Sequence, residues 1–282
     1  MLNTLKGRDF LINIFFCGND KAFDGILIST LSLVKHTKKA IALYILTADF
    51  KDEKNKPISE FHESYINKIL TTVNKNSFAK LLDISDIFVP EMRKNPNFES
   101  FYTPYCMLRL YADKIPELPD KIIYLDTDIV LRDDISLLFN IDVSNYELGA
   151  VEDYLGKWFK HRGYINSGVL LLNLSMIRET GLFEKTRKKC AEKKMWFPDQ
   201  DALNKVLSKK LMLDKKFNSQ HKGYPDTVIR HFCKTIRLLP FYHTENIKPW
   251  QIDQVHKTLK TTEFDDILND YLKRIERIKS NV

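Results

Sequence analysis

The sequence lacks long apolar runs and any sign of an export signal. No apolar run in its 282 residues approaches the roughly 18 residues that a membrane-spanning helix needs. The first ten residues, MLNTLKGRDF, contain no apolar stretch ahead of a small-residue cleavage site, so no secretory signal is expected. We therefore expect a cytoplasmic protein, and peripheral contact with the inner face of the membrane stays open.

Cysteine is also scarce, and its spacing carries no metal or redox pattern. The four cysteines, Cys17, Cys106, Cys190 and Cys233, form no C-x-x-C pair. Such scattered thiols are typical of buried cysteines in a reducing compartment. The remaining composition, 44% apolar and 29% charged, is that of an ordinary globular protein, which excludes disorder, collagen and low complexity.

Positive charge is in excess, but the excess is confined to one segment. The chain has 44 Lys and Arg against 37 Asp and Glu, and residues 183–222 contain 12 of the basic and 5 of the acidic residues. One interpretation is that this segment forms a solvated basic surface without a partner. The other is that its positive charge attracts an anionic acceptor or a lipid surface. No helix-turn-helix, RNP or zinc-finger pattern accompanies the charge, so nucleic acid is not an expected partner.

Apolar runs of strand length alternate with helical stretches along the chain. Expected strands are 11–17, 41–46, 78–82, 121–125, 147–151 and 164–172, and expected helices are 22–36, 57–70, 103–113, 176–194 and 199–209. A turn-rich loop is expected at 90–97. The β-α-β-α-β order predicts an α/β protein with a parallel sheet covered by helices and binding sites at the carboxyl ends of its strands.

The chain has no internal repeat and no linker, so residues 1–250 are expected to form a single domain. The remaining residues, 251–282, are expected to form a C-terminal helical segment, because Leu268, Tyr271, Leu272, Ile275 and Ile278 recur at helical spacing. The simplest interpretation is a helix that docks on the domain. A helix on a membrane surface is the alternative.

The most informative stretch is a buried apolar strand that ends in Asp126-Thr127-Asp128. Asp-x-Asp after a strand can be an ordinary acidic turn. Two carboxylates one residue apart can also share a hard divalent cation that bridges a diphosphate. A third interpretation is an aspartyl-phosphate phosphatase with Asp126 as nucleophile. The βαβαβ unit that precedes the motif counts against the phosphatase, because that motif normally follows the first strand.

Further segments fit one pattern together with this strand. They are FFCGNDKAF, TPYCMLRL with Arg109, YLDTDIVLRD, LGAVED ending at Asp153, YINSGVLLLN, PDQDALN, and KPW at 248–250. In their order and near spacing they resemble glycosyltransferase family 8. These are retaining enzymes that include glycogenin and bacterial lipopolysaccharide galactosyl- and glucosyltransferases. The resemblance covers about residues 13–250.

The resemblance implies a GT-A-like nucleotide-diphospho-sugar transferase fold with a mostly parallel central sheet. About residues 1–140 would bind the nucleotide, and about 141–250 the acceptor. The implied reaction moves a hexose, glucose or galactose, from a UDP-sugar to a hydroxyl of a saccharide or glycolipid with retention of configuration. It would use Mn²⁺ or Mg²⁺ and serve cell-surface glycan synthesis, including that of lipopolysaccharide.

The resemblance also implies roles for individual residues. Nucleotide-sugar binding would fall to Cys17, Asn19, Asp20, Asp126, Thr127, Asp128, Asn166, Ser167 and Lys248. Catalytic roles would fall to Arg109, Asp153, Asp199 and Gln200. From the residues alone, Asn19 fits a helix cap equally well. Gly168 after Asn166-Ser167 would permit close approach of a sugar ring.

The sequence offers two candidates for the third metal ligand. The family pattern His-x-x-Gly-x-x-Lys-Pro-Trp appears here as His243-Thr-Glu-Asn-Ile-Lys248-Pro-Trp, one residue shorter and without the glycine. We expect Asp126, Asp128 and His243 to hold the metal, with His231 as the rival. His231 is expected at the opposite end of an apolar strand at 236–241, too far from the ion to bind it.

Two other functions remain as alternatives. One is the Asp-x-Asp phosphatase, which would release inorganic phosphate from small phosphoesters. The other is a nucleotide-sugar-binding protein without turnover, which would bind UDP but neither hydrolyse nor transfer from any UDP-hexose.

Overall fold

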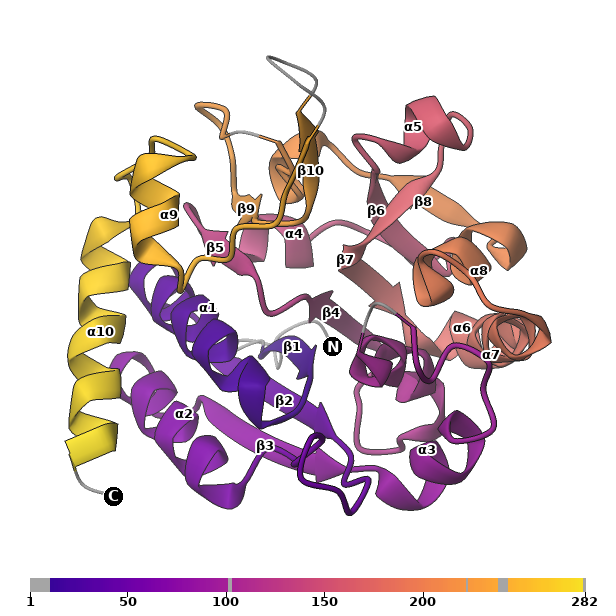
Figure 1. The fold of residues 1–282 in the computed structure, drawn as a ribbon, viewed down its shortest axis with the longest axis horizontal. Coiled ribbons are helices and arrows are strands. Elements are labelled where there is room, and N and C mark those ends of the chain that lie inside the picture. Colours follow the sequence, from indigo (N-terminus) through magenta and orange to yellow (C-terminus); the bar gives the residue numbers. More distant parts are fainter. Residues whose placement is uncertain (1–10, 101–102, 222, 238–242, 281–282) are drawn as a thin grey trace, which may run out of the picture.

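A seven-stranded sheet forms the centre of the computed structural model, in the order β3-β2-β1-β4-β7-β6-β8 (Figure 1). Residues 11–100, 103–221, 223–237 and 243–280 are described, with only the backbone for Arg237 and His243. The strands are β1 (Ile12–Cys17), β2 (Ile41–Thr47), β3 (Phe78–Asp83), β4 (Lys121–Leu125), β6 (Leu148–Glu152), β7 (Ile165–Asn173) and β8 (Lys210–Met212). Neighbouring strands are parallel except where β7 runs antiparallel to β4 and β6, so the predicted mostly parallel sheet is confirmed.

Helices cover both faces of this sheet, because both faces of its central strands are apolar. On β1, Ile14 and Phe16 point to one apolar cluster and Phe15 to the other. The first cluster includes α1 (Phe23–His36), α2 (Glu60–Val73) and α10 (Asp265–Ser280). The second includes α3 (Ser85–Met92), the 3₁₀ helix η2 (Pro104–Lys114), α6 (Leu174–Thr180), α7 (Leu182–Glu192) and α8 (Pro198–Val206).

Two small sheets lie beside the main one, near the carboxyl end of β4. In the first, β5 (Ile129–Leu131) pairs antiparallel with β9 (Ile229–His231). In the second, β10 (Thr235–Arg237) pairs antiparallel with β11 (His243–Glu245). The remaining short elements are η1 (Asp20–Ala22), α4 (Ser136–Phe139), α5 (Gly156–Phe159), η3 (Lys215–Phe217) and α9 (Ile252–Lys257).

Some expected elements differ from the structure. Helix α3 occupies part of the expected loop, with Pro90 inside the helix two residues before its end. The expected helix 176–194 is two helices, because Gly181 adopts a left-handed conformation (φ 66°) that ends α6 and redirects the chain into α7. The expected strand 236–241 lies mostly outside the described residues.

The C-terminal helix α10 lies along α1 at the outer side of the molecule (Figure 1). It buries Ile267, Leu268 and Tyr271. In the described part of the chain, no helix combines the length and the hydropathy that a bilayer-crossing segment requires.

Candidate active site

A cavity of about 830 Å³ opens where β1 and β4 end, and both halves of the chain line it. Cys17 and Asn19 come from the first half, and Asn166, Gln200 and Lys248 come from the second. The cavity therefore lies at the carboxyl ends of parallel strands, where the sequence predicted a binding site.

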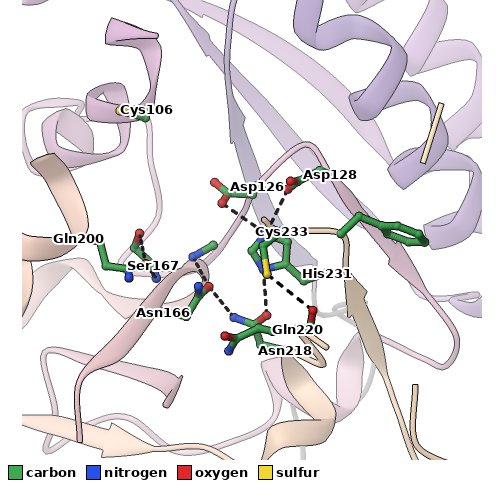
Figure 2. Close-up of polar contacts among 12 residues, drawn as sticks. Cys106, Asp126, Asp128, Asn166, Ser167, Gln200, Asn218, Gln220, His231 and Cys233 are labelled. Carbon is green, nitrogen blue, oxygen red and sulfur yellow. Dashed lines mark hydrogen bonds and ion pairs between the residues drawn. The ribbon is translucent and has the colours of Figure 1, made fainter. Parts of the chain in front are cut away.

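The acidic turn and a histidine both line this cavity, and their side chains lie close together (Figure 2). Strand β4 delivers Asp126, and the pairing of β5 with β9 places His231 opposite Ile129, directly after Asp128. His231 Nε2 lies 3.1 Å from Asp128 Oδ1 and 3.7 Å from Asp126 Oδ2. One ligand atom from each of the three residues lies within 4.8 Å of the others.

A chain of hydrogen bonds fixes the tautomer of His231. The Gly168 amide donates to Asn166 Oδ1 at 3.0 Å, and Asn218 Nδ2 donates to the same oxygen at 2.9 Å. Asn218 Oδ1 is therefore the atom that faces His231 Nδ1 at 3.0 Å. Because an amide oxygen only accepts, Nδ1 carries the proton. The Nε2 atom then directs its lone pair or a second proton at the two carboxylates.

This donor set fits a divalent cation. Two carboxylates and one imidazole nitrogen suit Mn²⁺ and related ions. With the Nδ1 proton donated to Asn218, a neutral imidazole would place its Nε2 lone pair toward two anionic groups, an arrangement that a cation between them makes favourable. Gly168 keeps this space open, because a Cβ there would lie 2.3 Å from His231 Cε1 and 2.6 Å from Asp126 Oδ2.

Lys248 reaches the same turn from the C-terminal side. Its Nζ donates to Asp128 Oδ2 and, at 3.2 Å, to the carbonyl of Phe232. Burial of Asp128 opposes ionisation, but the charges of Lys248 and His231 outweigh it and hold the pKa of this carboxyl well below its ordinary value. These two neighbours therefore favour the charged form of the carboxylate.

Arg109, on η2, links the acidic turn to α8. Its guanidinium lies 3.0 Å from Asp126 Oδ1 and 3.4 Å from Asp199 Oδ2, and it donates to the Ser167 carbonyl at 2.5 Å. It also stacks over Tyr124, 4.2 Å from the ring centroid. Burial opposes the charge, but Asp126, Tyr124 and Asp199 raise the pKa of Arg109 above its ordinary value, so it stays cationic.

The predicted sugar-pocket residues form one network at the start of β7 and α8. Asp153 Oδ2 accepts from Asn166 Nδ2 at 2.9 Å and from Gln200 Nε2 at 3.2 Å. Gln200 Oε1 accepts from the Ser167 amide at 2.9 Å and from its hydroxyl at 3.2 Å. The same hydroxyl lies 3.1 Å from Asp199 Oδ2. The structure thus brings together all five of these residues.

The predicted nucleotide-binding turn is only partly in the cavity. Cys17, Asn19 and Thr127 line it, and burial raises the pKa of the Cys17 thiol. Asn19 precedes η1 but its side chain makes no capping hydrogen bond, so the cap interpretation is not supported. Asp20 lies outside the lining, where its carboxylate accepts from the Lys21 amide at 2.8 Å.

The expectation that His231 lies far from the acidic pair is wrong. It assumed one long strand between His231 and His243, whereas the chain continues from β9 into the separate β10–β11 hairpin. The side chain of His243 lies outside the described residues, and its backbone pairs with that of Arg237. The role expected of Gly168 also changes, since its missing Cβ makes room for His231 and Asp126.

Sequence reasoning missed several contributors to the site. Asn218 is buried and orients His231, and Tyr124 donates to Asp126 Oδ1 at 2.5 Å. Gln220 holds the loop before α5, donating to the Glu152 carbonyl at 3.0 Å and accepting from the Tyr154 amide at 2.8 Å. Tyr124 was detectable, because it is the one polar aromatic in the strand that leads to Asp126. Asn218 and Gln220 had no local signal.

Comparison with known proteins agrees with this geometry. The model of the family "Glycosyl transferase family 8" matches residues 13–254. Lipopolysaccharide 1,3-galactosyltransferase of Salmonella typhimurium is 25% identical over 223 residues, 72% of this chain and 62% of the relative. Glycosyltransferase GlyF of Streptococcus pneumoniae is 26% identical over 204 residues, 71% of this chain and 47% of the relative. The chain thus spans less than two thirds of either relative.

A solved structure shows the same fold. Galactosyltransferase LgtC, in complex with donor and acceptor sugar analogs, superimposes with a TM-score of 0.65 at 18% identity, covering 92% of this chain and 96% of LgtC. The predicted GT-A-like fold class is thereby confirmed. Since the family match covers more than half of the sequence, the chain belongs to glycosyl transferase family 8.

Proposed function

We propose that this protein is a metal-dependent retaining glycosyltransferase that moves a hexosyl group from a UDP-sugar to a saccharide hydroxyl. One observation carries the proposal: Asp126, Asp128 and His231 converge in the lining of a cavity that also contains a network of polar groups suited to a sugar. LgtC, bound to donor and acceptor sugar analogs, has the same fold.

The part of the cavity around Asn19, Asp126 and Asp128 is proposed to bind the nucleotide. Asn19 presents an amide with both a donor and an acceptor, which is enough to recognise an edge of uracil. Asp126, Asp128 and His231 would hold Mn²⁺ or Mg²⁺, and a bound divalent ion neutralises the negative charge that develops on a departing diphosphate. Lys248 lies beside Asp128 and supplies a second positive charge for the same oxygens.

The part of the cavity around Asp153, Asp199 and Gln200 is proposed to hold the hexose. Asp153 and Asp199 are acceptors for its hydroxyls, and Asn166 keeps Asp153 in place. Arg109, which is held in its charged form, lies between Asp126 and Asp199 and fixes the distance between the two ends of the donor site. Together, the two parts of the cavity would orient the bond between C1 of the hexose and the diphosphate oxygen, which is the bond that breaks.

Gln200 is proposed to stabilise the anomeric cation and not to attack it. Its amide oxygen already accepts two hydrogen bonds from Ser167, and its nitrogen donates to Asp153. An amide is a weak nucleophile, and two donors on its oxygen weaken it further. Retention is then best explained by attack of the acceptor on the face that UDP leaves, while Gln200 directs its fixed dipole at the oxocarbenium-like carbon.

The proposal predicts that UDP binding requires the metal. Asp126→Ala and Asp128→Ala should lower the affinity for UDP in the presence of Mn²⁺ by at least about tenfold, because each removes one of three ligands. Isothermal calorimetry with Mn²⁺ and with EDTA measures this, and circular dichroism checks that the variants fold. Equal UDP affinity with and without EDTA would contradict the metal site.

The stereochemical outcome is a second, independent prediction. An α-linked UDP-hexose should give an α-linked product, because entering and leaving groups share one face of the ring. The coupling constant of the anomeric proton in the product decides the question. A β-linked product would overturn the proposed mechanism, while UDP binding without transfer or hydrolysis would favour the alternative of a protein that binds and does not turn over.

A further inference from the structure

Large aromatic side chains stand exposed beside the mouth of the cavity. Trp158 and Phe159, on α5, are 77% and 70% exposed, and Trp196, between α7 and α8, is 85% exposed. Among the described residues these are the three most exposed large hydrophobic side chains. Exposed tryptophans of this kind occur at interaction sites more often than on the rest of a protein surface.

The two segments that carry them border the same opening. Phe159 and Phe197, each next to one of the tryptophans, both line the cavity. Lys160 pairs with Asp201 at 3.1 Å, which ties the loop after α5 to α8. Helix α5 projects from the body of the molecule (Figure 1). Trp158 and Trp196 themselves do not line the cavity, and their high exposure means that their indoles face solvent.

The charge of these segments is entirely positive. Residues 157–162 and 193–197 contain Lys157, Lys160, Arg162, Lys193 and Lys194 and no acidic residue. Lys157 lies over the rings of Tyr154 and Trp158, at 5.4 and 5.8 Å. We call these two segments the aromatic–basic rim. Lys193 and Lys194 also belong to the stretch 183–222 that contains the positive excess of the chain.

We propose that the aromatic–basic rim docks on the headgroup layer of an anionic bilayer, so that the cavity faces a glycolipid whose saccharide is the acceptor. The acceptor class rests on the proposed transferase function, whereas the docking does not. Tryptophan prefers the interface between water and lipid, and lysine and arginine are attracted to anionic headgroups. Together they would lay the mouth of the cavity against the membrane surface, where a lipid-linked hydroxyl is presented.

Two other occupants fit the rim less well. A second copy of the chain across a two-fold axis would bring the same positive segments together, and like charges repel. A free saccharide would stack on aromatic rings inside the cavity, but Trp158 and Trp196 lie outside it. A bilayer satisfies both the charge and the outward direction of the indoles.

Vesicle binding of the full chain tests the proposal. The protein is sedimented with vesicles of phosphatidylcholine alone and with vesicles of equal parts phosphatidylcholine and phosphatidylglycerol. We expect binding to the second kind only, weakened by high salt, with a blue shift of tryptophan emission. The double variant Trp158→Ser/Trp196→Ser, and separately Lys193→Glu/Lys194→Glu, should lower the partition coefficient by at least about tenfold.

Matched controls separate the rim from bulk charge and hydrophobicity. Lys38→Glu/Lys39→Glu changes the net charge equally at two exposed lysines that precede β2, away from the carboxyl strand ends where the cavity opens, and should bind as wild type does. Leu272→Ser removes an exposed apolar side chain from α10, the rival membrane helix, and should also bind normally. Loss of binding in Leu272→Ser with none in the rim variants would assign the membrane surface to α10 and overturn the proposal.

The remaining outcomes are equally decisive. No binding of the wild type to anionic vesicles would overturn the docking. Concentration-dependent dimers in sedimentation velocity that disappear in Trp158→Ser/Trp196→Ser would assign the rim to a second copy. UDP binding with Mn²⁺ should be unchanged in the rim variants, because neither tryptophan lines the cavity. Failure of UDP binding in the wild type would instead count against the transferase function and leave the vesicle result standing.

Discussion

At the scale of single residues, the proposed metal site depends on a histidine held at both ring nitrogens. Asn218 Oδ1 accepts a hydrogen bond from Nδ1, and Nε2 faces Asp126 and Asp128. His231 is buried, so the ring has little freedom to turn away. An imidazole oriented in this way by its second nitrogen is a common arrangement at metal sites.

At this scale we predict different effects of replacing the two histidines His231 and His243. His231→Ala should weaken Mn²⁺ binding in the presence of UDP by about tenfold or more, because it removes one ligand and leaves two carboxylates to hold the ion. His243→Ala should leave the affinity close to that of the wild type. Titration of Mn²⁺ followed by calorimetry gives both values.

Asn218 supplies the control for this comparison. Asn218→Asp keeps an acceptor for His231 Nδ1 and should retain more affinity than Asn218→Leu, which has none. A sharp loss in His243→Ala with none in His231→Ala would restore the expectation drawn from the sequence.

The acidic residues of the site could be identified from sequence, whereas its histidine could not. Asp126 and Asp128 follow directly from an apolar strand, which places them at the carboxyl edge of the sheet by a local rule. The place of His231 depends on the pairing of β5 with β9, whose members are about a hundred residues apart and three residues long. Strands this short leave no periodicity to detect.

At the scale of elements, β7 departs from the parallel arrangement expected from the sequence, because it runs antiparallel to both of its neighbours. It follows β6 after a connection that contains only the four-residue helix α5. Parallel neighbours need a longer crossover, so the short connection already favours an antiparallel pair. The break at Gly181 is different, because glycine within a helical pattern is tolerated often enough that it does not decide between one helix and two.

For the C-terminal helix we predict the loss of stability on shortening two of its leucines. Leu268 on α10 is 1% exposed in the cluster formed with α1, whereas Leu272, one turn further, is 41% exposed. Leu268→Ala should lower the free energy of unfolding by about 2–5 kcal/mol, and Leu272→Ala by less than about 0.5 kcal/mol. Urea denaturation followed by circular dichroism measures both. Similar small effects at the two positions would mean that α10 does not dock on α1 in solution.

At the scale of the whole molecule, the two halves share both their core and their cavity. One apolar cluster contains Ile12 from the first half and Leu171 from the second, and the cluster on the other face contains Phe15 and Leu170. The seam between the halves is the pairing of β4 with β7, in the middle of the sheet. Unfolding either half would therefore expose apolar surface of the other.

Whole-chain features explain why the fold was predictable even though several elements were not. Residues 17–19, 126–128, 166–167 and 199–200, which come from four separate motifs, all line one cavity. A chain must fold in one particular way to bring such distant segments together, so their joint presence constrains the topology more than any single strand assignment does. Features away from the cavity, such as the α6–α7 break, are not constrained by these motifs.

The last prediction follows from the shared core. The chain should unfold in one thermal transition, and UDP with Mn²⁺ should raise the temperature of that whole transition. A ligand that binds only the folded state stabilises it by about 2.7 kcal/mol at a hundredfold excess over its dissociation constant. Because the cavity is lined by Asn19 from the first half and Gln200 from the second, neither half can unfold while the ligand stays bound. Differential scanning calorimetry with Mn²⁺, and with EDTA as the control that should abolish the shift, makes the measurement. Two transitions of which only one moves with ligand would show that the two halves of the chain are separate folding units.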